Sequence, residues 1–166
     1  MNNPTLQEAI MAAVKSTISG IHTAIPGIIE SYDYTTCKAE VKPSIKRQYV
    51  DGSVLSMPII VNVPVIWPRT KNGSITFPLE RGDSILIIFS ERSLENWLSK
   101  GHDVTPGDRR KFDISDAIAI PGLFSFDEPV KTTSNDKFEI HYNDSSITIN
   151  SSGQVNINNG NLTIDL

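Results

Sequence analysis

The sequence is poor in the residues that build disulfide, metal and nucleic-acid sites. Among 166 residues there are one cysteine and three scattered histidines, so no internal disulfide forms and no zinc-type cluster is present. Lysine and arginine (15) are outnumbered by aspartate and glutamate (19), and aromatic residues make up only 7%. The net charge of −4 gives no overall attraction for a polyanion, which disfavours nonspecific DNA binding.

Long hydrophobic runs are also missing. No stretch of about 20 apolar residues occurs, and the N-terminus lacks the charged, apolar and small-residue regions of a signal peptide. We therefore expect the chain to be made and kept in the cytoplasm.

Motifs of enzymatic chemistry are not found either. The sequence has no nucleophile elbow, no phosphate-binding glycine loop and no carboxylate pair in a setting that favours raised acidity. Asp83 and Asp116 are the candidate acids, but each stands at the entry to a strand-like run, where turn chemistry is expected. We expect no enzymatic activity.

Residues 5–19 are predicted to form a short amphipathic helix. Thr5 and Glu8 match a capping box, in which each side chain bonds to the backbone amide of the other residue. Pro26 and Gly27 are expected to mark the turn after the helix. Four apolar residues recur at every fourth position and form one stripe: Leu6, Ile10, Val14 and Ile18. This stripe either packs on its own domain or docks on a partner.

Short β-type runs occupy the middle of the chain. They are rich in Val and Ile and separated by Pro, Gly and Asp, as expected of strands: residues 27–32, 37–41, 53–66, 74–77, 84–89 and 117–120. A short helix is predicted at residues 93–98, capped by Ser93 and stopped by Gly101. This arrangement predicts a small closed barrel of the OB type.

Three side-chain environments follow from the same pattern. The short helix is expected to bury Leu94, Trp97 and Leu98. Cys37 is expected to lie within a strand as a small buried hydrophobe. Trp67 and Trp97 are expected to anchor the core or a domain interface.

The last 33 residues, 134–166, differ in composition from the rest. They contain seven Asn, five Ser and one basic residue, Lys137. Apolar residues alternate in pairs separated by short polar breaks: Phe138 and Ile140, Ile147 and Ile149, Val155 and Ile157, Leu162 and Ile164. Period-2 alternation in short repeats is typical of a β-solenoid or an intertwined β-prism. The alternative is a disordered tail, which has no use for β-branched residues in alternation.

The tail predicts a homotrimer. Four short strands from one chain expose an apolar row and two open edges, and are too small to be stable alone. Three copies around a threefold axis turn the eight paired apolar residues inward and pair the strand edges between chains. The chain thus divides into a helix and linker (1–26), a barrel (27–125), a linker (126–133) and a β spike (134–166).

Several motifs in the middle of the chain form a recognisable pattern. They are residues 77–83 (FPLERGD), 85–97 (ILIIFSERSLENW), 112–117 (FDISDA) and Pro121-Gly122, with Trp67-Pro68 and the runs at 27–30 and 37–41. This pattern resembles the N-terminal domain of phage central spike proteins, the baseplate assembly protein V-like, membrane-piercing spikes of contractile tails. The matching positions are Trp67, Pro78, Gly82, Asp83, Phe89, Trp97, Gly101, Asp116 and Gly122.

The resemblance implies a trimer with a mechanical function. Three OB-type domains would form a collar, and a triple-stranded β-helix below them would form a needle. The spike would close the tail tube under a hub protein, which the stripe of Leu6, Ile10, Val14 and Ile18 is the candidate to contact. It would pierce the bacterial envelope, with transient contact to the outer membrane, when the sheath contracts. Its location would be the tail baseplate of the virion, after assembly in the host cytoplasm.

The sequence departs from this family at its C-terminal end. Many such spikes end in an apex where His-x-His pairs from three chains hold iron. Here His22, His102 and His141 are never two apart, so no cofactor is expected and metal at His141 is disfavoured. The strand rhythm continues to Leu166 without an apex, from which we expect either a separate small tip protein or a truncated chain.

Two other functions stay open. An OB barrel alone suggests an oligonucleotide- or carbohydrate-binding module, and the β tail alone suggests a fragment of a trimeric tail fibre. The acidic balance and few aromatics oppose the first. Two basic clusters are expected to face acidic neighbouring subunits or solvent: Lys42, Lys46 and Arg47, and Arg109, Arg110 and Lys111.

Overall fold

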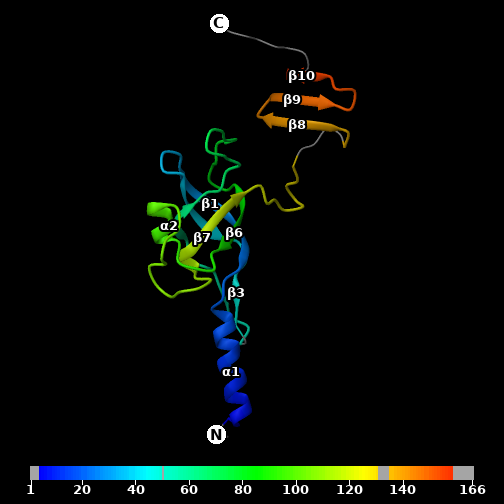
Figure 1. Ribbon diagram of the computed structural model, residues 1–166. Helices are drawn as coiled ribbons and strands as arrows, with labels where there is room; N and C mark the ends of the chain where they lie inside the picture. Colours follow the sequence, from blue (N-terminus) through cyan, green and yellow to red (C-terminus); the bar gives the residue numbers. More distant parts are fainter. Residues whose placement is uncertain (1–3, 50, 131–134, 159–166) are drawn as a thin grey trace. The chain divides into compact units, whose positions relative to one another are not determined.

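The computed structural model describes residues 4–49, 51–130 and 135–158, and in this part the chain is mainly β (Figure 1). It divides into two compact units, Met1–Ser125 and Phe126–Leu166. The first contains α1 (Leu6–Ser19), β1 (Ala24–Asp33), β2 (Lys38–Pro43), β3 (Arg47–Gln48), β4 (Val54–Leu55), β5 (Ile60–Pro64), β6 (Ser84–Phe89), α2 (Glu95–Lys100), the 3-10 turn η1 (Ile114–Asp116) and β7 (Ala117–Pro121). The second contains β8 (Lys137–Tyr142), β9 (Ser145–Asn150) and β10 (Val155–Ile157).

The helix α1 begins as its sequence predicts. Thr5 is the N-cap, its Oγ1 accepts from the amide of Glu8, and the Glu8 carboxylate accepts from the amide of Thr5 at 2.7 Å. This hydrogen bond from the Thr5 backbone lowers the pKa of Glu8. The helix buries none of its residues, so within the single chain its apolar stripe does not pack on the adjoining domain.

Five strands of the first unit form a curled antiparallel sheet, a half-barrel, in the order β5-β2-β1-β6-β7. Curling brings the outer strands together: Val65 and Ala119 form an isolated parallel bridge, and the amide of Ile66 donates to the carbonyl of Ala119 at 2.9 Å. Burial alternates along β2 and β6, as expected of strands with one face on a core. The largest fully buried side chains are those of Ile29, Val41, Val63, Ile85 and Ile87.

The prediction of a turn at Pro26 and Gly27 is wrong, because both residues lie inside β1. Gly27 pairs with Ile85 of β6 and Pro43 of β2. A Cβ at Gly27 would stand 2.5 Å from Cδ1 of Ile87 and 2.9 Å from the carbonyl oxygen of Lys42. The glycine is therefore required by close packing in the middle of the sheet.

Two predicted strands are altered. The run 53–66 divides into β4 and β5 around Pro58, since proline has no amide to donate to a sheet ladder. β4 pairs instead with β3 in a separate two-stranded hairpin. The run 74–77 does not form a strand. Ser74 makes an isolated antiparallel β-bridge with Arg69.

The short helix α2 also differs from its prediction. It begins at Glu95, Leu94 occupies the N-cap position without a side-chain hydrogen bond, and Trp97 and Leu98 are about half exposed. Ser93 does not cap it: its Oγ is buried and has no hydrogen-bond partner among the described residues. Gly101 follows the last turn with φ +65°, and its amide donates to the carbonyl of Trp97, as a helix stop should.

Cys37 is exposed in the turn between β1 and β2 with φ +53°, so the prediction of a buried strand residue is wrong. The turn forms because the Asp33 carboxylate accepts from the Thr35 amide and hydroxyl at 2.8 and 2.6 Å and from the Thr36 hydroxyl at 2.8 Å. Local hydrogen bonds of this Asx type outweigh the β propensity of the following residues.

In the second unit, β8, β9 and β10 form a three-stranded antiparallel sheet in the order β10-β9-β8 (Figure 1). β8 and β9 are joined by a tight turn at Asn143, which has φ +52°. The register places Phe138 and Val155 opposite Ile149, and Ile140 and Ile157 opposite Ile147. Leu162 and Ile164, assigned to the same apolar row, lie outside the described residues.

Candidate functional site

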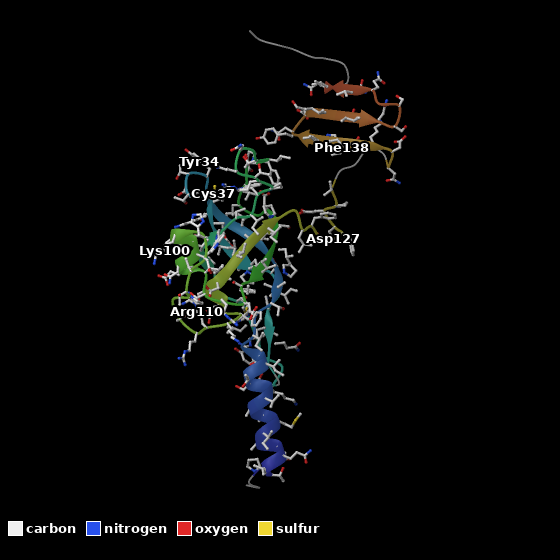
Figure 2. All side chains as sticks on the ribbon, viewed as in Figure 1. Tyr34, Cys37, Lys100, Arg110, Asp127 and Phe138 are labelled. Carbon is white, nitrogen blue, oxygen red and sulfur yellow. The ribbon has the colours of Figure 1, made fainter. Side chains whose placement is uncertain are left out.

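The apolar face of the β8–β10 sheet is the first candidate surface. Two ranks of apolar side chains cross the three strands, Phe138–Ile149–Val155 and Ile140–Ile147–Ile157. All but Ile157 are exposed, from 39% for Ile149 to 60% for Phe138, whose side chain is labelled on β8 in Figure 2. The predicted period-2 pattern therefore gathers these residues on one face. Such a contiguous apolar surface is typical of a protein interface.

The opposite face of this sheet is polar. On β8, Nε2 of His141 lies 3.4 Å from Oε2 of Glu139. On β9, the amide of Ser146 donates to the side-chain oxygen of Asn158 at 2.9 Å. These groups, together with Thr148, are the ones expected to face solvent when the apolar face is covered. A sheet with one apolar and one polar face is built to pack on one side only.

The helix α1 and the β3–β4 hairpin form the second candidate surface. The guanidinium of Arg47 on β3 donates to the carbonyl of Ser19, the last residue of α1, at 3.2 Å. A cation at this end of a helix is favourable, because the last carbonyls have no partner within the helix. Large exposed apolar residues occur on both elements: Leu6, Ile10, Met11, Val14 and Ile18, and Val54 and Leu55.

An ion pair fixes the segment between β6 and β7. Asp116 is 2% exposed and accepts from Nε of Arg110 at 2.6 Å, from Nη2 of Arg110 at 3.2 Å, and from the amide of Leu94 at 2.9 Å. The hydrogen bond to Asp116 raises the pKa of Arg110. Asp116 therefore ties the start of α2 to the start of β7, which is a structural role.

A groove of about 690 Å³ lies beside this ion pair. Lys38, Glu95, Arg110 and Asp116 are among its lining residues. The two charged groups that are best placed for chemistry, Arg110 and Asp116, already satisfy each other. Within this groove, the Arg110–Asp116 pair is therefore a structural contact between α2, η1 and β7.

Aromatic residues line a second groove, of about 570 Å³, at one end of β1. Trp67 is buried, its indole nitrogen donates to the hydroxyl of Tyr32 at 3.2 Å, and Phe77 meets it edge to face at 4.6 Å. Burial raises the pKa of Tyr32. Trp67 is thus a core anchor, as predicted, while Tyr34 and Phe77 stay exposed at the rim.

The remaining motif positions serve the turns and ends of the half-barrel. The Asp83 carboxylate accepts from the amide of Glu80 at 2.7 Å, and Gly82 has φ +100°; the Asp83 carbonyl accepts from the amide of Ile29 on β1 at 2.9 Å. Asp83 is therefore a turn residue, as predicted. Phe89 is buried, and Gly122 has φ +105° directly after β7; Pro78 lines the aromatic groove.

The sequence predictions missed the Arg110–Asp116 pair and assigned Arg110 to an outward-facing basic cluster. The sequence does contain one indication that Arg110 pairs with acidic residues: Asp108 stands two positions before it, and its Oδ2 lies 2.8 Å from Nη1 of Arg110. Within the described residues, no three His, Cys, Asp or Glu side chains are grouped as a metal site would require. No helix in this part of the chain is long and apolar enough to cross a membrane.

The family model described as "Phage protein Gp138 N-terminal domain" matches residues 25–122, which span the half-barrel from β1 to the residue after β7. Because the match covers more than half of the chain, this protein belongs to the Gp138 N-terminal domain family. It is accordingly a tail-associated phage protein with a structural role in the virion. No curated protein matches the chain.

Proposed function

We propose that three copies of this chain form the central spike of a contractile-tail baseplate. The spike closes the tail tube under the hub and pierces the bacterial envelope when the sheath contracts. The observation that carries this proposal is the exposed apolar face of the β8–β10 sheet, with its two ranks in register across three strands.

A threefold arrangement would cover the apolar face of this sheet and pair its open edges. Three faces turned toward one axis bury the ranks of Ile149 and Ile147 against their copies and leave the face of Thr148 and His141 in water. β8 and β10 are the outer strands, and each offers an open edge to a neighbouring chain. Pairing between chains would turn the sheet into an intertwined β-helix.

The half-barrel suits the collar of such a spike. Its five-stranded order and the Val65–Ala119 bridge between its outer strands support our proposal that it is a nearly closed barrel of the OB type. The exposed stripe of α1, Leu6, Ile10, Val14 and Ile18, is the surface we assign to the hub.

The work of this assembly is mechanical, and we propose no enzymatic step. Strands paired between chains cannot unfold singly, so the needle would resist axial load through slow unfolding. The polar outer face would let the needle pass through a membrane without residing in it.

Immunogold labelling of virions tests the proposal. Antibodies raised against the purified chain should label the distal end of the tail tube in the phage that encodes it. Label on lateral fibres would contradict the spike assignment and favour a fibre fragment.

A second candidate, a ligand-binding barrel, draws support from the aromatic groove. Tyr34 and Phe77 are exposed at its rim, above the buried Trp67, and aromatic rims stack on bases and sugars. Quenching of tryptophan fluorescence by oligonucleotides or soluble glycans, lost in Phe77→Ala, would favour this function.

A further inference from the structure

A basic groove lies on the loop between α2 and β7. It has a volume of about 740 Å³ and is lined by residues that include Arg92, Thr105, Gly107, Arg109 and Lys111. The only acidic residue of its lining, Asp108, is engaged by Arg110 at 2.8 Å, and Arg92 pairs with Glu91 at 2.8 Å. No ion pair of Arg109 or Lys111 is seen within the described residues. Two unpaired cations therefore dominate this groove.

The loop that carries these cations is held in place. The side-chain amide of Asn96 on α2 donates to the carbonyl of Thr105 at 2.9 Å. Arg110, which lies close to α2 (Figure 2), is bound to the buried Asp116. Arg110, which stands between the two cations in the sequence, thus points inward, while Arg109 and Lys111 are exposed. A charged groove on a fixed loop binds a partner at little entropic cost.

A complementary segment follows β7. Residues 123–130 (LFSFDEPV) are all exposed, and Phe126 is 98% exposed. The segment combines four large apolar side chains with two adjacent carboxylates, those of Asp127 and Glu128; Asp127 is labelled in Figure 2. We call it the acidic-aromatic segment. Its charge is opposite to that of the basic groove, and its aromatic rings need a cover.

Along the chain, the groove residues come before β7 and the acidic-aromatic segment comes after it. The basic loop enters β7 at Ala117, and the acidic-aromatic segment leaves β7 after Pro121. At about 3.3 Å per residue, the strand separates these two points by roughly 13 Å. Two different, complementary surfaces on one subunit are what a head-to-tail contact requires, and such contacts form a ring when the rotation between copies closes.

We propose that the acidic-aromatic segment of each copy lies in the basic groove of the next copy around the ring. Asp127 and Glu128 pair with Arg109 and Lys111, and Phe126 covers the apolar part of the groove. This inference rests on the proposed homotrimer and adds to it a specific contact, which joins neighbouring chains between the half-barrel and the β8–β10 sheet.

A charge-exchange experiment tests the contact. One variant carries Arg109→Glu and Lys111→Glu, and the other carries Asp127→Lys and Glu128→Lys. Alone, each places like charges against each other, and we expect its trimer to dissociate roughly tenfold faster at low salt than the wild type. When the two variants are co-expressed with different tags, we expect mixed trimers in excess of random mixing, because two of the three contacts in a mixed ring pair opposite charges, whereas all three contacts in an unmixed ring oppose like charges.

The control is Lys71→Glu with Lys100→Glu, which changes the charge equally at two exposed lysines outside both basic clusters. Its trimer should dissociate at the wild-type rate; an equal acceleration would overturn the inference, since any charge change would then suffice. Unchanged dissociation in both loop and segment variants, or random mixing on co-expression, would also overturn it while leaving the trimer standing. A monomeric wild-type chain would overturn both this contact and the proposed function.

Discussion

Asp116 and Arg110 lie six residues apart and form the ion pair around which the segment before β7 is organised. The carboxylate is 2% exposed and receives three hydrogen bonds, two of them from the guanidinium and one from the amide of Leu94. Removing this carboxylate breaks all three hydrogen bonds, two of them charge-assisted, and takes the acceptor away from the amide of Leu94, although Arg110 keeps its contact with Asp108.

Asp116→Ala should therefore lower the free energy of unfolding by about 3 kcal/mol. Unfolding in urea, followed by tryptophan fluorescence, measures this change. Asp108→Ala is the matched control, because Asp108 binds the same guanidinium at an exposed position and should cost less than about 1 kcal/mol. Equal losses in the two variants would contradict the role given to Asp116.

Gly27→Ala should destabilise the half-barrel by about 1–3 kcal/mol. The new methyl group would meet the backbone carbonyl of Lys42 at 2.9 Å and Cδ1 of Ile87 at 2.5 Å, so the central strands must move apart. The control is Gly73→Ala, whose methyl group would meet only Oγ1 of Thr70 at 3.7 Å. Thermal unfolding compares the two variants, and a neutral Gly27→Ala would show that this part of the sheet is loosely packed.

The turn after β1 should depend on pH through Asp33. Hydrogen bonds from Thr35 and Thr36 hold the pKa of Asp33 at about 2. Since this pKa lies below that of an unfolded aspartate, about 3.9, the carboxylate stabilises the fold above the unfolded value. That contribution is lost as the pH falls toward the folded value.

Asp33→Asn should thus destabilise the protein at pH 5 and have little effect at pH 2. Titration of the Asp33 carboxyl carbon by NMR measures the pKa directly. A midpoint near 4 would mean that the three hydrogen bonds are not kept in solution.

The apolar face of the tail predicts an asymmetry between adjacent residues of β9. Ile149→Asp should abolish the trimer, because it places a carboxylate from each of three chains around one axis. Thr148→Asp lies on the polar face of the same strand and should leave the trimer intact. Size-exclusion chromatography distinguishes these results; a stable trimer in Ile149→Asp, or equal loss in both variants, would contradict the inward assignment.

Features with short-range causes were predictable from the sequence. The capping box of Thr5 and Glu8 and the stop at Gly101 each depend on neighbours within one helical turn. The alternation in the tail was sufficient to place Ile147 and Ile149 on one face. That the chain is a tail-associated phage protein was also predicted, from motif residues with structural roles such as Gly82 and Asp83, but the family that matches is the Gp138 N-terminal domain and not the baseplate assembly protein V-like spikes named by the resemblance.

Features with long-range causes were not predictable in this way. Gly27 looks like a turn residue until Ile87, sixty positions later in the chain, is packed against it. Asp116 was predicted to be a turn residue at the entry to a strand, because the sequence does not show that the fold places Leu94 and Arg110 within hydrogen-bond distance of it. Cys37 was misassigned because the hydrogen bonds of Asp33 extend the turn into the run that β propensity favours.

The mass of the purified chain in solution tests the central claim most directly. Light scattering across a dilution series, repeated in mild SDS without heating, should give a persistent mass near three times 18.3 kDa. Such a mass is expected if the faces of the β8–β10 sheets cover one another in an intertwined trimer. A monomer of 18.3 kDa at all concentrations would contradict the spike and leave the ligand-binding barrel as the better account.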